Sequence, residues 1–161
     1  ERVLVVDCDV HQGDGTAELC AGDPLTFALS VHAAANYPFH RATSDCDVDL
    51  PSGTGDDDYL AALETALHES FPVARPDLVI FLAGADPWEG DGLGRLALTK
   101  AGLRARDELV TGLTDAYGLP CCVTLAGGYA PDVGDTVAIA LATAELVAHR
   151  ARGTTLASAG P

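Results

Sequence analysis

The chain has no methionine and a single lysine, Lys100, and only 6% of its residues are aromatic. Its 24 acidic residues outnumber the 9 basic ones, which gives a formal net charge of -15 at pH 7. A negative field repels the phosphates of nucleic acids and of anionic membranes, so we expect neither as a partner. Surplus acid also serves solubility, and the charge does not by itself identify a cationic substrate.

The cysteines lack the C-x-x-C spacing, and an odd number of them cannot all pair within the chain: Cys8, Cys20, Cys46, Cys121 and Cys122. We therefore expect reduced thiols and a cytoplasmic location. No apolar run is long enough to span a bilayer, and the first residues do not resemble a signal peptide. Because there is no methionine and Glu1 immediately precedes a predicted core strand, we expect a part of a longer protein.

Apolar runs alternate with helical periods along the 161 residues, which predicts βα units in one domain. The predicted fold is α/β, a parallel sheet with helices on both faces. Strands are expected over 2–7, 26–31, 77–83 and 121–125. Helices are expected over 16–20, 56–71, 99–117 and 131–150, with Pro72 and Pro76 ending the second. Residues 32–55 are expected to form a long loop with a brief extended piece at 48–50, and 153–161 a frayed polar tail.

The first predicted strand leads into Asp7-Cys8-Asp9-Val10-His11-Gln12-Gly13-Asp14-Gly15. Polar side chains that follow a buried parallel strand lie at the carboxyl edge of the sheet, where sites form. Asp9 and His11 are two residues apart, so an extended backbone points both to one side, together with Asp7. These side chains could reach one ion. An acidic turn is the alternative, because Asp and Gly are ordinary turn residues.

Two other strands also end in groups with chemical potential. Asp86 follows the strand over 77–83, and Tyr129 follows the strand over 121–125. Since parallel strands end at one edge, we expect these side chains to meet Asp9 and His11 in one crevice. Two carboxylates and one imidazole make a three-ligand site with room for water, as in a catalytic zinc centre. For Tyr129 alone, without the other motifs, a packed aromatic after a glycine turn is the preferred interpretation.

Three motifs in this order resemble the zinc-dependent histone deacetylase family, most closely its class IV branch and the bacterial relatives of that branch. They are Asp7 to Gly15, Gly84-Ala85-Asp86 with Glu89-Gly90-Asp91, and Gly127-Gly128-Tyr129. The resemblance extends from Arg2 to about the final helix. It implies an arginase/deacetylase-like fold present in part, with residues 1–152 as the C-terminal part of a single deacetylase domain.

The resemblance implies that Asp9, His11 and Asp86 ligate zinc. It also implies that Tyr129 donates its hydroxyl to the substrate carbonyl and then to the oxyanion. Gly128 and Leu93 are then expected to contact the acyl chain of the substrate. Trp88 either lines the tunnel that the resemblance implies for the acyl chain, or packs within its own loop.

The resemblance implies two further features. A structural potassium ion would be held by Asp7, Ser30 and Val31 together with the backbone of Asp9 and His11. Asp7 and Asp14 match the aspartates that hold a pair of adjacent catalytic histidines in the family. No histidine of this chain has a histidine neighbour. We therefore expect the chain alone to be inactive, because general acid–base help contributes about a hundredfold to ten-thousandfold.

The function implied is a zinc hydrolase that removes acetyl or longer acyl groups from lysine or small related amines. The first alternative keeps the fold as a metal-binding pseudoenzyme or interaction module. The second is a manganese ureohydrolase of the arginase type, with a two-metal cluster. A phosphoacceptor receiver domain fits less well, since it needs a lysine after its last strand and Lys100 begins a predicted helix.

Overall fold

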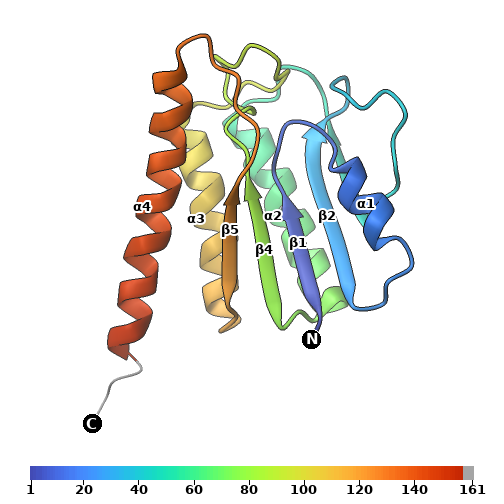
Figure 1. Cartoon of the computed structure of the whole chain (residues 1–161), viewed down its shortest axis with the longest axis vertical. Helices are drawn as coiled ribbons and strands as arrows, with labels where there is room; N and C mark the ends of the chain where they lie inside the picture. Colours follow the sequence, from blue (N-terminus) through green and yellow to red (C-terminus); the bar gives the residue numbers. More distant parts are fainter. Residues whose placement is uncertain (158–161) are drawn as a thin grey trace.

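The computed structural model describes residues 1–157, and 158–161 lie outside the described part. Five strands form one sheet, all neighbours parallel, in the order β3-β2-β1-β4-β5 (Figure 1). They are β1 (Val3–Asp7), β2 (Thr26–Ala33), β3 (Cys46–Leu50), β4 (Leu78–Ala83) and β5 (Cys121–Leu125). The predicted parallel α/β sheet is confirmed.

Helices lie on both sides of this sheet, as predicted. They are α1 (Asp14–Cys20), α2 (Asp56–Ala74), α3 (Lys100–Ala116) and α4 (Val133–Ala157). α2 and α3 cover one face, and α1 lies on the other face against β2 (Figure 1). α4 lies beyond β5 and packs against α3, where Thr143 Oγ1 donates to Asp107 Oδ2 at 2.5 Å.

Two helices end later than predicted. α2 continues through Pro72 to Ala74, because a proline in the last turn removes only one backbone hydrogen bond. The helix ends instead at Ala74. Arg75 follows as its C-cap, with a left-handed backbone (φ 44°) and an N–H that donates to Phe71 O at 2.9 Å. α4 continues past the predicted end to Ala157, so the tail expected over 153–161 is helical as far as that residue.

The long loop expected from residue 32 begins later and contains a strand. β2 includes His32, which is fully buried and was expected in the loop. Its Nε2 lies 3.1 Å from Asp49 Oδ1 on β3. β3 reads Cys-Asp-Val-Asp-Leu, and this alternation of apolar and acidic residues is the period of an edge strand with one covered face.

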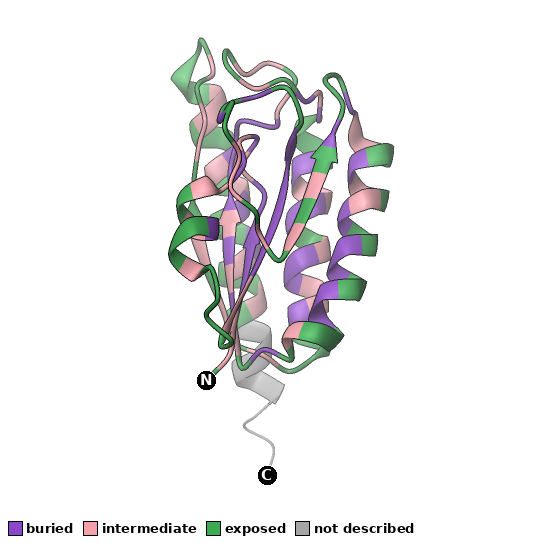
Figure 2. Ribbon diagram, turned by 90° about the vertical axis from the view of Figure 1, so that its right-hand side faces the viewer, coloured by how far each residue is buried: buried purple, intermediate pink, exposed green. Residues whose placement is uncertain are grey.

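The hydrophobic core lies between the sheet and the two helices α2 and α3 (Figure 2). In β4 the buried residues alternate with half-buried ones, so that Phe81 faces the core and Ile80 faces away from it. The core is filled by fully buried side chains from all these elements, among them Leu4, Val6, Leu29, Val79, Leu63, Phe71 and Val110. On the opposite face β4 and β5 are only partly covered, and Cys122 is exposed.

The carboxyl ends of β1 and β4 lie side by side in the middle of the sheet. Asp7, the last residue of β1, pairs with Ser30 of β2 on one side and Leu82 of β4 on the other. After β1 the chain adds β2 and β3 on one side, and then β4 and β5 on the other. Ligands of parallel sheets bind in the crevice at such a reversal of strand order.

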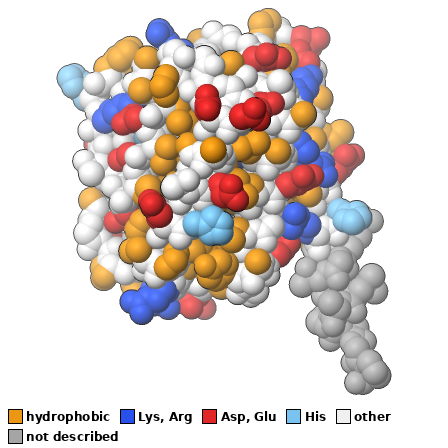
Figure 3. Space-filling model, turned by 180° about the vertical axis from the view of Figure 1, so that it is seen from behind, with side chains coloured by type: hydrophobic (Ala, Val, Ile, Leu, Met, Phe, Trp, Pro, Cys, Tyr) orange, Lys and Arg blue, Asp and Glu red, His pale blue; other side chains and the backbone are white. Residues whose placement is uncertain are grey.

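Acidic side chains are spread over the surface seen from behind, with fewer basic ones between them (Figure 3). This distribution agrees with the net charge of -15 and offers no basic patch on that face of the described residues. Within residues 1–157, no helix has the length and hydrophobicity needed to cross a membrane.

Thr99 joins the beginnings of α2 and α3. Its Oγ1 accepts from Gly102 N at 2.9 Å and donates to Asp56 Oδ2 at 2.7 Å. We predict that Thr99→Ala lowers the free energy of unfolding by about 1 kcal/mol, measured by urea denaturation, because a helix N-cap is lost. The control is Thr65→Ala, which removes only an exposed hydroxyl bonded to Ala61 O within α2. Equal losses in the two variants would contradict this role of Thr99.

Candidate metal centre

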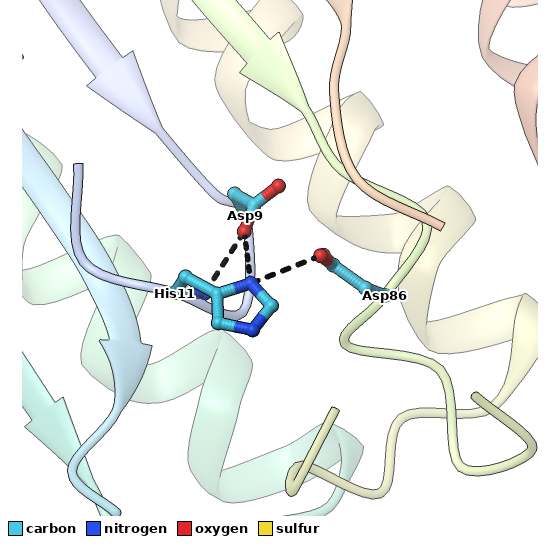
Figure 4. A group of neighbouring side chains, drawn as sticks. All are labelled: Asp9, His11 and Asp86. Carbon is cyan, nitrogen blue, oxygen red and sulfur yellow. Dashed lines mark hydrogen bonds and ion pairs between the residues drawn. The ribbon is translucent and has the colours of Figure 1, made fainter. Parts of the chain in front are cut away.

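Asp9, His11 and Asp86 meet at the reversal of strand order. Asp9 and His11 lie in the loop after β1, and Asp86 lies in the loop after β4. One donor atom from each lies within 4.8 Å of the other two. His11 Nδ1 is 2.9 Å from Asp9 Oδ1 and 3.4 Å from Asp86 Oδ2 (Figure 4). The structure therefore brings together three of the four side chains that the sequence predicted to converge, and the fourth, Tyr129, is not in this group.

Three backbone N–H groups, from the loops after β1 and β5, fix the two carboxylates. Asp9 Oδ1 accepts from His11 N at 2.9 Å, and Asp9 Oδ2 accepts from Gly127 N at 2.8 Å. Asp86 Oδ1 accepts from Val10 N at 2.9 Å. Asp86 Oδ2 is buried and accepts no hydrogen bond from the described residues, although it faces the His11 ring. A buried carboxylate oxygen without a donor is a position that a cation would satisfy.

Two glycines make room for these carboxylates. A Cβ on Gly127 would lie 1.9 Å from Asp86 Oδ2 and 2.6 Å from Asp9 Oδ2. A Cβ on Gly84 would lie 2.8 Å from Asp86 Oδ1. The glycines at these two strand ends are thus required by the close approach of the backbone to the acidic groups.

The electrostatics of the centre also call for positive charge. Burial raises the pKa of Asp86, and Asp9 adds to the rise by repulsion. Burial likewise raises the pKa of Asp7 to about 7. The Asp86 carboxylate, with Asp9, raises the pKa of His11 to about 9. Two carboxylates and an imidazole suit zinc in a site that leaves a position for water, so the residues present fit the metal that the sequence implied.

The residues predicted to hold a monovalent cation also lie at this edge. Asp7 pairs in register with Ser30, and Val31 follows it fully buried. Asp7 Oδ1 accepts from Asp9 N at 3.0 Å. Ser30 Oγ lies 2.9 Å from His32 Nδ1 and accepts from Gly13 N at 3.3 Å. The hydroxyl therefore has protein partners already.

Asp14 occupies the first position of α1 and is half-buried. Its Oδ1 accepts from Gly15 N at 2.9 Å, and no hydrogen bond joins it to a histidine within the described residues.

The backbone of Tyr129 is held by hydrogen bonds, but within residues 1–157 its hydroxyl forms none with the three ligands. Tyr129 N donates to Asp91 Oδ2 at 2.6 Å, and Gly92 N donates to Tyr129 O at 3.1 Å. The side chain is 55% exposed, and its hydroxyl forms no hydrogen bond within residues 1–157. Gly128, just before it, approaches so closely that an added Cβ would lie 3.1 Å from the Cβ of Ala85.

Asn36 is a buried residue of this region that no sequence pattern indicated. Its Nδ2 lies 3.4 Å from His11 Nε2 and donates to Leu93 O at 3.0 Å. Its Oδ1 accepts from Arg95 N at 2.9 Å. Asn36 therefore links the far side of the His11 ring to the loop that carries Leu93, whose side chain is exposed. A polar residue in a long irregular segment has no periodicity that would distinguish it.

Trp88 packs within its own loop. A Cβ on Gly90 would lie 2.4 Å from the Trp88 ring, and Lys100 Nζ lies over the ring, 5.0 Å from its centroid. These contacts favour the packing role over a place in a tunnel wall.

Comparisons with known proteins agree with these motifs. A family model described as histone deacetylase domain matches residues 1–145. An uncharacterized protein of Picosynechococcus sp. is 44% identical over 137 residues, which are 85% of this chain and 46% of that protein. Histone deacetylase 2 of Arabidopsis thaliana is 35% identical over 131 residues, covering 80% of this chain and 34% of the relative.

A solved histone deacetylase structure is also similar to this chain. The histone deacetylase Clr3 of Schizosaccharomyces pombe matches with a TM-score of 0.73 at 31% identity, over 89% of this chain and 26% of that one. The chain spans less than half the length of each of these three relatives. The parallel sheet, its order of strands and the matched sequence leave one conclusion: this chain has part of an arginase/deacetylase-like fold and belongs to the histone deacetylase family.

Proposed function

We propose that the complete protein is a zinc-dependent deacetylase that removes acetyl or longer acyl groups from lysine or small related amines. Membership of a family of deacetylases supports hydrolysis of an acylated amine. The observation that carries the proposal is the meeting of Asp9, His11 and Asp86 around a buried carboxylate oxygen without a hydrogen-bond donor.

Zinc would be held by Asp9, His11 through Nδ1, and Asp86. When bound there, it polarises the amide carbonyl and activates a water molecule. The chain's own contribution is to hold the ligands rigidly, through the backbone N–H groups of Val10 and Gly127 that orient the carboxylates. One group of residues in the described chain has donor atoms this close together, which favours a one-metal centre over the two-metal cluster of a ureohydrolase.

Tyr129 would act directly on the substrate. Its hydroxyl would donate to the amide carbonyl and stabilise the negative charge that develops on that oxygen. The anchored backbone and the half-exposed side chain suit a group that must meet an incoming substrate. Gly128, directly before Tyr129, and Leu93, on the loop after β4, would contact the acyl chain.

Asp7, Ser30 and Val31 would hold a potassium ion with backbone oxygens of Asp9 and His11, and this ion would relieve the buried charge of Asp7. Asp7 and Asp14 would also orient two catalytic histidines from another part of the domain. In this proposal residues 1–152 form the C-terminal part of a single cytoplasmic deacetylase domain, and the chain alone is inactive. The short span relative to the relatives and the partly covered face of β4 and β5 support it.

We predict that Asp9→Ala and His11→Ala each lose zinc, measured as bound metal per protein after dialysis. Removing one of three protein ligands leaves too few donors for a stable site. Asp57→Ala and His68→Ala, which change exposed residues of α2, are the matched controls and should retain zinc. Full zinc content in His11→Ala would show that the metal is held elsewhere.

Tyr129→Phe should retain zinc and lose turnover in the complete protein. The substitution removes only a hydroxyl, and loss of one donor to a developing oxyanion lowers kcat by about a hundredfold to a thousandfold. The measurements are zinc content and kcat on an acetylated lysine peptide. Tyr117→Phe, at the exposed end of α3, is the control. A Tyr129→Phe enzyme with near-full rate would remove the hydroxyl from the proposed mechanism.

Zinc affinity should rise with pH. The pKa of His11 without metal is raised to about 9, so at neutral pH zinc must displace a proton from the ring. Between pH 6 and pH 8 we therefore expect affinity to increase about tenfold per pH unit from this proton alone, and to level off as the pH passes about 9. Chelator competition at several pH values measures the slope. An affinity independent of pH across this range contradicts displacement of a His11 proton.

A further inference from the structure

A guanidinium lies buried directly behind the two loops that carry the metal ligands. Arg106, on α3, is fully buried and is the largest side chain of the described residues with that degree of burial. Arg104, two residues earlier on the same helix, is half-buried, pairs with Glu108, and donates to Ala142 O at 3.3 Å rather than to the loops of the site. A charge without access to water must have partners that fix its position, since its desolvation is costly.

Arg106 connects the end of β1 to the end of β4. Its Nη1 donates to Gly84 O at 2.5 Å and to Cys8 O at 3.3 Å. Cys8 is the residue immediately before Asp9, and Gly84 stands two residues before Asp86. One nitrogen atom therefore contacts the backbone of both segments next to their metal-ligating side chains.

The other side of the guanidinium is equally constrained. Arg106 Nε and Nη2 donate to Asp107 Oδ1 at 2.9 Å and 2.7 Å. Asp107 Oδ2 in turn accepts from Thr143 Oγ1 of α4 at 2.5 Å. The Phe81 ring of β4 lies with its centroid 5.7 Å from Arg106 Cζ. The fork geometry of arginine lets it hold the aspartate and the carbonyls together, which a lysine cannot do.

The loops joined in this way carry groups that repel one another. Asp7, Asp9 and Asp86 are acidic groups within the same small region, and both Asp7 and Asp86 are buried. Repulsion among these carboxylates favours a larger separation of the loops after β1 and β4, which hydrogen bonds between the loops oppose. The hydrogen bond from Val10 N to Asp86 Oδ1 joins the loops on the ligand side, and Arg106 joins them from behind.

We propose that Arg106 is a positioning residue for the metal centre: it sets the separation of Asp9 and Asp86 by clamping the carbonyls of Cys8 and Gly84. Asp107 and Thr143 orient the clamp. This inference rests on the proposed function only in taking Asp9, His11 and Asp86 as metal ligands.

The test measures metal binding rather than activity. Arg106→Met and the matched control Arg104→Met are compared in zinc affinity, by chelator competition, and in the visible absorption of the Co²⁺-loaded protein, which reports ligand geometry. We expect Arg106→Met to bind zinc about tenfold or more weakly and to show a changed Co²⁺ spectrum, as substitutions behind metal ligands do. Arg104→Met should stay within about twofold of the unsubstituted chain on this scale.

Thr143→Val and Arg106→Lys keep the test decisive if Arg106→Met does not fold. Thr143→Val removes only the hydroxyl that orients Asp107, and Arg106→Lys keeps the charge but not the fork. Both should weaken zinc binding and alter the Co²⁺ spectrum at a temperature where circular dichroism shows them folded. Unchanged affinity and spectrum in the folded variants overturn the clamp. Absence of metal binding in the unsubstituted chain would instead contradict the proposed function.

Discussion

The constraint on which the site depends is the burial of negative charge at the point where β1 and β4 end side by side. Asp7 and Asp86 lie inside the protein, and Asp9 lies next to them. Desolvation and repulsion both disfavour this arrangement unless cations or hydrogen-bond donors neutralise it. The surrounding loops donate backbone hydrogen bonds to Asp86 Oδ1 and Asp9 Oδ2. The buried Asp86 Oδ2 accepts no hydrogen bond from the described residues.

The backbone around these carboxylates is adapted to them. Gly127 contributes an N–H to Asp9 and lacks the Cβ that would collide with Asp86. Because Gly127 has no side chain, the backbone of the turn after β5 can approach Asp9 and Asp86 closely. These two residues follow β1 and β4, so the turn contacts a site formed mainly by the ends of those strands. The same turn leads into Tyr129, so the segment that satisfies the ligands also carries the residue proposed to contact the substrate. Gly127, which positions a proposed ligand, and Tyr129, which is proposed to act on the substrate, therefore lie two residues apart.

Sequence reasoning could locate this centre because its signal is periodic and local. Asp9 and His11 follow an apolar run at a spacing of two, and Asp86 follows another, so the rule for parallel strand ends was enough to bring them together. It failed where tertiary contacts decide. His32 lies in β2, where its ring contacts Ser30 and Asp49 of β3. The end of α2 was missed for a local reason, because a proline in the last turn removes only one backbone hydrogen bond.

The roles of Asn36 and Arg106 could not be predicted from a sequence pattern, for a different reason. Each acts through contacts with segments distant in sequence, and neither type of residue is distinctive in a loop or on a helix. Arg106 even stands in a helix rich in charge, where an exposed ion pair would be the ordinary reading. Only its burial separates it from Arg104.

The two faces of the sheet differ in how completely the site is enclosed by residues of this chain. All three donor atoms of the proposed metal centre lie within the chain, with a rigid shell on the side of α3. The opposite side is less complete: Ile80 and Leu82 are half-buried, Tyr129 is half-exposed, and Asp14 bonds only its neighbour Gly15. In the proposed function, the metal would be bound by residues of this chain, whereas the groups that exchange protons with the substrate would come from another part of the domain. On that proposal, metal binding and turnover are separable properties.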